Sequence, residues 1–230
     1  VYGGFTTVNG VVTGTGLTVS GNTITGNRSV GAWIDEGRDP AIPNGGIVIR
    51  NNVIASNDSA GISIEISRGP VKVFDNLLMS NGVNAGWFWG GCLQAFDSSN
   101  VEAYGNTCDV AASYGAGMMV ISQGGREVSA CGNNFHHNRI ILRGPNSMTG
   151  ATGDNLASFC GTNVNRFNDN AYFVATPVDV TQARWAWNDD EMGWAAFRSL
   201  SKQEAHSTVT VGLPAAETIA PVVVPPRESN

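Results

Sequence analysis

Charged residues are scarce in this chain, and none of them form a basic run. Only 14% of the 230 residues are charged, and 19 acidic residues outnumber 13 Lys and Arg residues, giving a formal net charge of −6. Because nucleic-acid binding depends on clustered Lys and Arg, this composition argues against a nucleic-acid partner. The chain also lacks an apolar run approaching the roughly 20 residues that cross a bilayer, so we expect no membrane span.

What the chain has in abundance is glycine and a repeated short-strand pattern. Its 29 glycines follow no collagen-like period and indicate many tight turns between short strands. Five segments align without a gap as an apolar strand, an Asn and a second short apolar strand: Leu17–Asn27, Ile47–Asn57, Val71–Asn81, Val101–Ala111 and Val128–Asn138. Their first asparagines are Asn22, Asn52, Asn76, Asn106 and Asn133, which by subtraction gives steps of 30, 24, 30 and 27 residues. Such steps predict one solenoid coil each, with stacked asparagines in a structural role.

A second strand, led by glycine, recurs between these segments. It begins at Gly31, Gly61, Gly91 and Gly117. Period-2 alternation predicts that seven of its residues point inward, namely Ala32, Ile34, Ile62, Ile64, Cys92, Met118 and Val120. The same alternation predicts that seven point outward, namely Trp33, Asp35, Ser63, Glu65, Leu93, Ala95 and Asp97. Each coil is therefore expected to contain at least two strands and a variable loop.

The repeat resembles the right-handed β-helix repeat of the pectate-lyase-like superfamily over about Leu17 to Phe173. The GAWIDEG and GISIEIS strands and the later WNDDEMGWAAFRSLSKQEAHST stretch are similar to secreted bacterial β-helix proteins. The expected fold is all-β, a right-handed parallel β-helix with a short C-terminal helix and an extended tail. The resemblance also implies a secreted or cell-surface location. It does not select an activity, because the superfamily includes lyases, hydrolases, epimerases, phage tailspikes and structural solenoids.

Three parts of the chain are distinguished. Residues 1–16 are expected to form a partial N-terminal coil or cap, residues 17–175 the β-helix, and residues 176–230 a C-terminal cap. The chain begins with Val1, from which we expect a processed or trimmed segment. The short N-terminal coil predicts an open face that is covered by a partner, a missing segment or another copy of the chain.

The C-terminal cap is expected to contain one helix and a proline-rich tail. Asp189 and Asp190 offer an N-cap for a helix over about 189–200. The tail from Leu213 onward contains four prolines and predicts an extended strap or a loose end. Three tryptophans near the helix are interpreted as packing over the open end of the solenoid in preference to stacking on sugars: Trp185, Trp187 and Trp194.

The four cysteines show no C-x-x-C spacing, which argues against zinc. Cys92 and Cys108 fall at apolar positions of the repeat and are interpreted as core residues. Cys131 and Cys160 are about one coil apart, so we expect a disulfide between them, which would indicate an extracytoplasmic setting.

Acidic residues recur at one offset of the glycine-led strands. Asp35 and Glu65 are predicted to point outward from adjacent coils about 4.8 Å apart, with Asp97 on the same parity of the next strand. One alternative is a retaining pair of carboxylates, one acting as nucleophile and the other as general acid. The other is a calcium site formed by Asp35, Glu65 and Asp97, with Arg68 or Arg38 abstracting a proton beside a uronate. This second pattern resembles the calcium-dependent pectate lyases.

Aromatic and basic side chains accompany these acids. The predicted substrate-binding residues are Trp33, Arg38, Trp87, Trp89 and Asp97, since sugar rings stack on aromatic faces. An exposed aromatic patch is equally typical of a subunit interface. The leading hypothesis is a carbohydrate-active protein that cleaves an acidic polysaccharide by lyase or hydrolase chemistry, with catalytic Asp35, Glu65 and Arg68. The alternative is a non-catalytic glycan-binding or assembly solenoid, such as a tailspike or a surface-fibre subunit.

Overall fold

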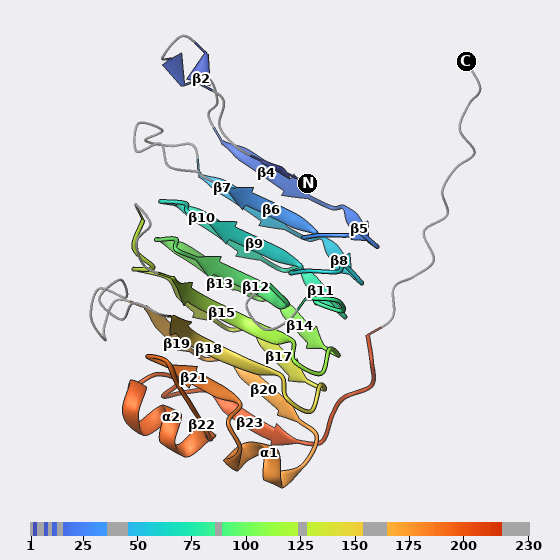
Figure 1. The fold of residues 1–230 in the computed structure, drawn as a ribbon, viewed down its shortest axis with the longest axis vertical. Coiled ribbons are helices and arrows are strands. Elements are labelled where there is room, and N and C mark those ends of the chain that lie inside the picture. Colours follow the sequence, from blue (N-terminus) through green and yellow to red (C-terminus); the bar gives the residue numbers. More distant parts are fainter. Residues whose placement is uncertain are drawn as a thin grey trace, which may run out of the picture.

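The computed structural model describes residues 16–35, 46–85, 89–123, 128–153 and 165–217, together with the strands at 2–3, 7–8 and 11–12. Within these residues three sheets built almost entirely of parallel strands run along a solenoid. Figure 1 shows the coils stacked in order from the blue N-terminal end to the orange C-terminal end. The predicted class, an all-β parallel β-helix, is confirmed.

The three parallel sheets are named C, D and A, and each coil takes one strand from each of them in that order along the chain. Sheet C contains β4 (Leu17–Ser20), β7 (Ile47–Arg50), β10 (Val71–Phe74), β13 (Val101–Tyr104), β16 (Asn134–His136) and β19 (Arg166–Asn168). Sheet D contains β5 (Thr23–Thr25), β8 (Val53–Ala55), β11 (Leu77–Met79), β14 (Thr107–Val110), β17 (Arg139–Leu142), β20 (Ala171–Val174) and β23 (Thr208–Val211). Sheet A contains β1 (Tyr2–Gly3), β6 (Ala32–Asp35), β9 (Ile62–Glu65), β12 (Gly91–Phe96), β15 (Ala116–Ser122), β18 (Met148–Gly153), β21 (Trp185–Trp187) and β22 (Asp190–Met192). A separate antiparallel hairpin is formed by β2 (Thr7–Val8) and β3 (Val11–Val12).

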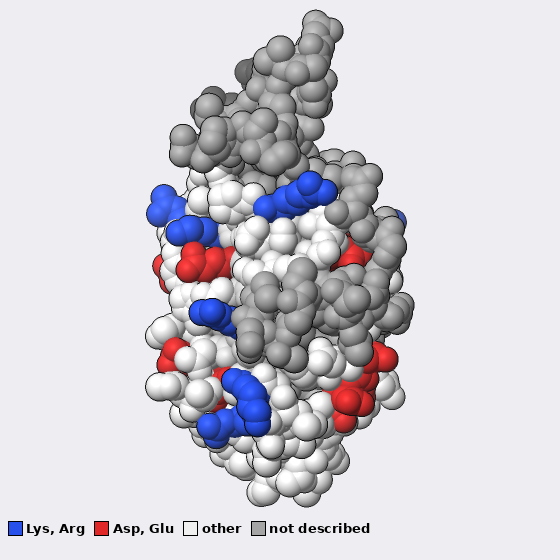
Figure 2. Space-filling view, turned by 90° about the vertical axis from the view of Figure 1, so that its left-hand side faces the viewer, with Lys and Arg blue, Asp and Glu red and all other residues white. Residues whose placement is uncertain are grey.

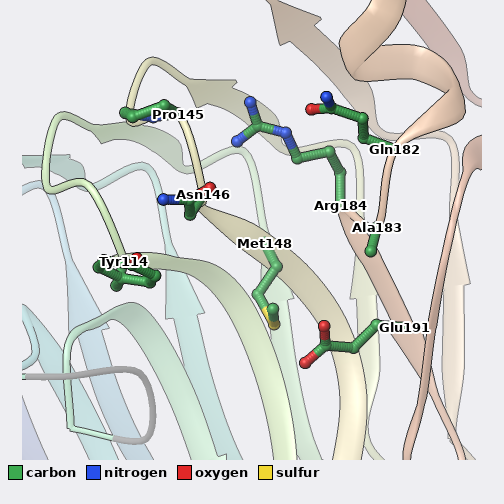
Figure 3. A pocket seen from close by; sticks show the side chains of 8 residues that line it. All are labelled: Tyr114, Pro145, Asn146, Met148, Gln182, Ala183, Arg184 and Glu191. Carbon is green, nitrogen blue, oxygen red and sulfur yellow. The ribbon is translucent and has the colours of Figure 1, made fainter.

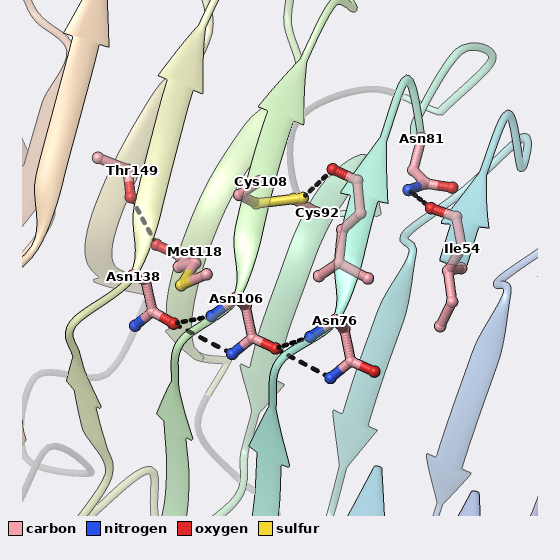
Figure 4. The surroundings of a disulfide bond; sticks show 10 residues. Ile54, Asn76, Asn81, Cys92, Asn106, Cys108, Met118, Asn138 and Thr149 are labelled. Atoms are coloured by element: carbon pink, nitrogen blue, oxygen red, sulfur yellow. Dashed lines mark hydrogen bonds between the residues drawn. A yellow bond between two sulfur atoms is a disulfide. The ribbon is translucent and has the colours of Figure 1, made fainter. Parts of the chain in front are cut away.

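The turn between sheets C and D has two positions whose conformation or side chain recurs in successive coils. The first has a positive φ between 54° and 70° at Gly21, Asn51, Asp75, Gly105, His137 and Asp169. Glycine, Asn, Asp and His are the residue types that tolerate this left-handed backbone best. The second is an asparagine whose side-chain amide donates to the next asparagine Oδ1, at 2.9 to 3.1 Å, through Asn22, Asn52, Asn76, Asn106, Asn138 and Asn170. This Asn ladder, part of which is drawn in Figure 4, joins one coil to the next.

The fifth predicted repeat is displaced by five residues. Asn138, and not Asn133, follows Asn106 in the Asn ladder, because Phe135 of β16 lies opposite Ala103 of β13. Asn133 belongs to a different turn and donates to Asn165 Oδ1 at 3.0 Å. In both turns an Asn side chain donates to the next Asn, so the sequence around Asn133 resembles that of the Asn ladder.

The interior of the coil is apolar and closely matches the predicted alternation in β6, β9 and β15. The six predicted inward residues of these strands are at most 1% exposed: Ala32, Ile34, Ile62, Ile64, Met118 and Val120. In β12 the prediction is wrong by one residue. Leu93 and Ala95, expected outside, lie inside opposite Ile62 and Ile64, because Cys92 takes the position that glycine occupies in the neighbouring strands.

Cys92 and Cys108 form a disulfide inside the coil, linking β12 to β14 with their Cα atoms 5.9 Å apart (Figure 4). They are core residues as predicted, and the disulfide between them was not predicted. Cys131 is not a free thiol, and its predicted partner Cys160 lies outside the described residues, so that second bridge stays a prediction.

The last coil is covered by two short helices, α1 (Pro177–Thr181) and α2 (Trp194–Ser201), as Figure 1 shows. The predicted helix over 189–200 begins later, at Trp194, because Asp190–Met192 pairs with β21 as an antiparallel strand. The sequence did not predict α1, which begins with a capping box formed by Thr176 and Asp179. Neither helix is long and apolar enough to cross a membrane.

The tryptophans near α2 pack as an end cap, as the sequence predicted. Trp185 is fully buried and Trp187 is 5% exposed. Rings of Tyr172 and Trp194 lie 5.9 Å and 5.2 Å from the Trp185 ring. Beyond β23, the described part of the tail lies along sheet D, where Arg139 pairs with Glu217 at 2.7 Å. The proline-rich remainder from residue 218 lies outside the described residues.

Candidate functional site

Asp35 and Glu65 end two adjacent strands of sheet A. They are register partners in the β6 and β9 pair, beside the inward pair of Ile34 and Ile64. Adjacent parallel strands lie about 4.8 Å apart, so the two carboxylates emerge side by side on the outer face. The structure therefore places this pair where the sequence predicted it.

The indole of Trp33 holds one of these carboxylates. Its Nε1–H donates to Glu65 Oε2 at 3.0 Å, reaching diagonally from β6 to β9. Glu65 is only 6% exposed, whereas Trp33 and Asp35 are half-buried. The two residues thus have different environments, with Glu65 buried in the face and Asp35 half-buried with its Oδ1 enclosed.

The third predicted acid is not in this row. Phe96, and not Asp97, lies opposite Glu65, because β12 is shifted by one residue. Asp97 has a left-handed φ of 41°, and its Oδ1 accepts the backbone N–H of Gln123 at 3.0 Å. Among the described residues no group of three or more His, Cys, Asp or Glu side chains could hold a metal ion. The predicted calcium ligands Asp35, Glu65 and Asp97 therefore do not fit a common site.

The same shift brings Gln94 to the outer face beside the acids. Its Nε2 donates to Ser63 Oγ at 3.0 Å, and both side chains are fully buried. Gln94 Oε1 is buried and has no hydrogen-bond partner in the described part of the chain. The sequence did not predict Gln94 here, although its polarity between Leu93 and Ala95 was a signal that these two apolar neighbours point inward.

Further along sheet A the outer face becomes apolar. A second hydrophobic cluster, separate from the coil interior, consists of Phe96, Ala116, Met119, Ile121 and Ala186. The predicted sugar-stacking residue Trp89 lies over it, with its ring 5.2 Å from the Phe96 ring and nearly parallel. Trp89 is 38% exposed, so part of its ring remains available beside the acidic pair.

The remaining predicted site residues are Arg68, Arg38 and Trp87, of which the structure describes only Arg68. Arg68 is exposed and follows Glu65 by three residues. Arg38 and Trp87 lie outside the described residues. Figure 2 shows one side of the molecule, on which acidic and basic side chains are interspersed among uncharged ones. The described residues of that side therefore do not form a field of one sign that would attract a strongly charged polymer.

Residues 9–107 match the family described as right handed beta helix region. The coils continue with the same parallel pairing beyond residue 107, through β17 and β20. Comparisons with curated proteins and with solved structures gave no match. Because one fold hosts many functions, the activity has to be argued from the side chains.

Proposed function

We propose that this β-helix protein is a carbohydrate-active enzyme that hydrolyses a polysaccharide on the outer face of sheet A. The observation that carries the proposal is the pairing of Asp35 with Glu65 on adjacent strands, with the Trp33 indole bound to Glu65. The strand spacing of about 4.8 Å allows the two carboxyl groups to approach the separation of about 5 Å that retaining glycosidases use.

The different surroundings of the two acids suit a division of roles. Glu65, oriented by the indole N–H, acts as the nucleophile at the anomeric carbon. Asp35, which is more exposed, protonates the departing glycosidic oxygen and then takes a proton from the water that releases the sugar. Ser63 and Gln94 lie next along the same face, fully buried and joined by a hydrogen bond, and support the strands that carry the acids.

Hydrolysis is favoured over calcium-dependent elimination by the donor set. A calcium ion needs six to eight oxygen ligands, and the row that begins with Asp35 and Glu65 continues with Phe96. The Cys92–Cys108 disulfide supports the expectation that the protein works outside the cytoplasm, where such bonds persist.

The test is depolymerisation of a panel of neutral and acidic polysaccharides by the full chain, with and without EDTA. We expect new reducing ends without the absorbance of unsaturated products, and no effect of EDTA. Asp35→Asn and Glu65→Gln should each lower the rate by about 100- to 10,000-fold with unchanged folding. Glu102→Gln, on the outer face of sheet C, is the matched control. Full activity of the double amide variant would exclude this site, and unsaturated products lost on chelation would select a lyase.

A second candidate is a non-catalytic glycan-binding or assembly solenoid, such as a tailspike or a surface-fibre subunit. It is favoured by the ring of Trp89, which is 38% exposed and lies against Phe96 of the apolar cluster. In this case the Trp33 and Trp89 region serves binding or subunit association. Light scattering separates the two, because a stable oligomer without depolymerising activity supports assembly and an active monomer supports the enzyme.

A further inference from the structure

An open pocket of about 500 Å³ lies at the edge of sheet A where its later strands begin (Figure 3). Tyr114 precedes β15, Asn146 precedes β18, and Arg184 precedes β21. The volume lies within the range of about 300 to 1,000 Å³ that small-molecule sites occupy. The pocket is distinct from the acidic pair, since Asp35 and Glu65 end their strands at the opposite edge of the sheet.

Apolar groups form part of the pocket wall and its rim. Tyr114 is 61% exposed and presents an aromatic ring, whereas Met148 is 6% exposed and contributes a buried thioether. Exposing a tyrosine ring next to a cavity leaves an apolar surface with a polar tip, which suits a ligand that is apolar on one face and polar at its edges. A pyranose ring has this character.

Polar groups from three separate segments face the same cavity. Asn146 and Gln182 bring side-chain amides, each with donors and an acceptor, and Glu191 brings a carboxylate. In Figure 3 the Glu191 carboxylate points toward Met148, and the Arg184 side chain lies between Asn146 and Gln182. Ring hydroxyls both donate and accept hydrogen bonds, so they match this mixture better than a purely anionic or purely apolar ligand does.

The charged groups of the pocket disfavour an anionic ligand. The Arg184 guanidinium is held by the fold, because it pairs with Asp179 and donates to the carbonyls of Gly144 and Ser147 at 2.7 Å and 3.0 Å. Its Nε–H is buried without a partner in the described part of the chain. Glu191 is exposed and forms no ion pair among the described residues, so its negative charge disfavours a carboxylate or phosphate ligand.

We propose that this pocket binds one neutral pyranose unit of a glycan. Tyr114 stacks on the ring, Asn146 and Gln182 bond its hydroxyls, and Glu191 accepts from two of them and discriminates against uronic acids. The role proposed for the pocket is binding, and among the described residues that line it Glu191 is the one acid. The proposal does not depend on hydrolysis at Asp35 and Glu65.

The experiment is ligand-observed NMR of the full chain with methyl β-glucoside, methyl β-galactoside, N-acetylglucosamine and galacturonate as probes, followed by calorimetry of the sugars that bind. We expect at least one neutral sugar to bind at millimolar concentration, and galacturonate to bind more weakly than the galactoside. Tyr114→Ala should lower the affinity for the neutral sugar by about tenfold or more. Glu191→Gln should reduce the difference in affinity between the galactoside and galacturonate.

Tyr104→Ala is the matched aromatic control, because Tyr104 lies in β13 of sheet C, outside the pocket lining, and should leave the binding of these probes unchanged. Trp89→Ala tests the competing location beside the acidic pair. Binding lost in Trp89→Ala but kept in Tyr114→Ala would overturn the pocket and support a sugar subsite near the acids instead. Absence of binding by every neutral probe, or tighter binding of galacturonate than of the galactoside, would also overturn the proposal. None of these results alters the test of the Asp35 and Glu65 pair by depolymerisation.

Discussion

The middle of the solenoid and its C-terminal end bury polar side chains in different ways. In the middle, Asn106 accepts from Asn76 and donates to Asn138, so neutral amides satisfy one another. At the end, Asn170 has no further asparagine to bond and donates to Glu204 Oε1 at 2.9 Å. Glu204 also accepts from the Tyr172 hydroxyl at 2.5 Å and from Ser207. A fully buried carboxylate thus ends the Asn ladder.

The end cap contains a second buried charge, on Asp179. Its carboxylate pairs with Arg184, and both side chains are less than 10% exposed. Burial alone would raise the pKa of Asp179, but the hydrogen bonds from Arg184 and Thr176 outweigh it and lower that pKa. At Glu204 the balance is reversed, because burial raises the pKa of this carboxyl more than its hydrogen bonds lower it.

The difference between these regions follows from repetition. Inside the solenoid each coil offers its neighbour an identical partner, so a polar group needs no charge to be satisfied. The last coil has no such neighbour and uses residues that occur once. Because an unpaired buried charge is far less favourable than an unpaired amide, the cap should be the more sensitive region.

The largest effect is expected from Asp179→Ala. This change leaves the Arg184 guanidinium buried without its counter-ion, and such losses lower the free energy of unfolding by about 3 to 5 kcal/mol. Urea denaturation followed by tryptophan fluorescence measures it. In the control double variant Asp179→Leu with Arg184→Met, which removes both charges, much of the stability should return. A loss below about 1 kcal/mol in the single variant would contradict this account.

Glu204→Ala is expected to lower the free energy of unfolding by about 2 to 4 kcal/mol, because buried donors lose their shared acceptor. Tyr172 and Asn170 both donate to Oε1 of this carboxyl. Glu204→Gln keeps one acceptor oxygen and should cost less. If both variants were as stable as the native chain, the hydrogen bonds to Glu204 would not stabilise the end of the Asn ladder.

A smaller effect is expected within the Asn ladder. Asn106→Ala should lower the free energy of unfolding by about 1 to 3 kcal/mol, since the backbone N–H of Asn76 loses its acceptor. Asn22, at the exposed start of the ladder, is the control, and Asn22→Ala should cost less than about 0.5 kcal/mol. Equal losses at the two positions would show that burial does not set the value of each amide.

The smallest effect is a pH dependence of opposite sign for the two cap acids. The pKa of Glu204 is raised above its ordinary value of 4.5, so its favourable contribution is complete below that pH and is lost as the pH rises through the folded-state pKa. The pKa of Asp179 is lowered from 3.8, so its contribution is present above that value and is lost as the pH falls through the folded-state pKa. Denaturation between acid and neutral pH should show the native chain losing stability relative to Glu204→Gln as the pH rises. A parallel pair of curves would contradict the raised pKa.

Features that depend on local periodicity were predictable from the sequence. The Asp35 and Glu65 pair lies where alternation and coil length placed it. The prediction was wrong where the Asn or Gly used to align a repeat was not the structurally equivalent residue, as at Asn133 and Gly91. In β12 the disulfide-bonded Cys92 stands in place of a glycine, and alignment on Gly91 turned Leu93 outward in the prediction.

The order of strands, the inward residues of most coils and the stacking of asparagines were thus determined by the sequence itself, because a solenoid repeats the same contact at a fixed step. Only the tertiary structure decided what happens where repetition stops. The partner of Asn170, the Arg184 pair and the pocket beside Tyr114 join residues from separate loops. No period links these positions, so their contacts arise from packing of the complete chain.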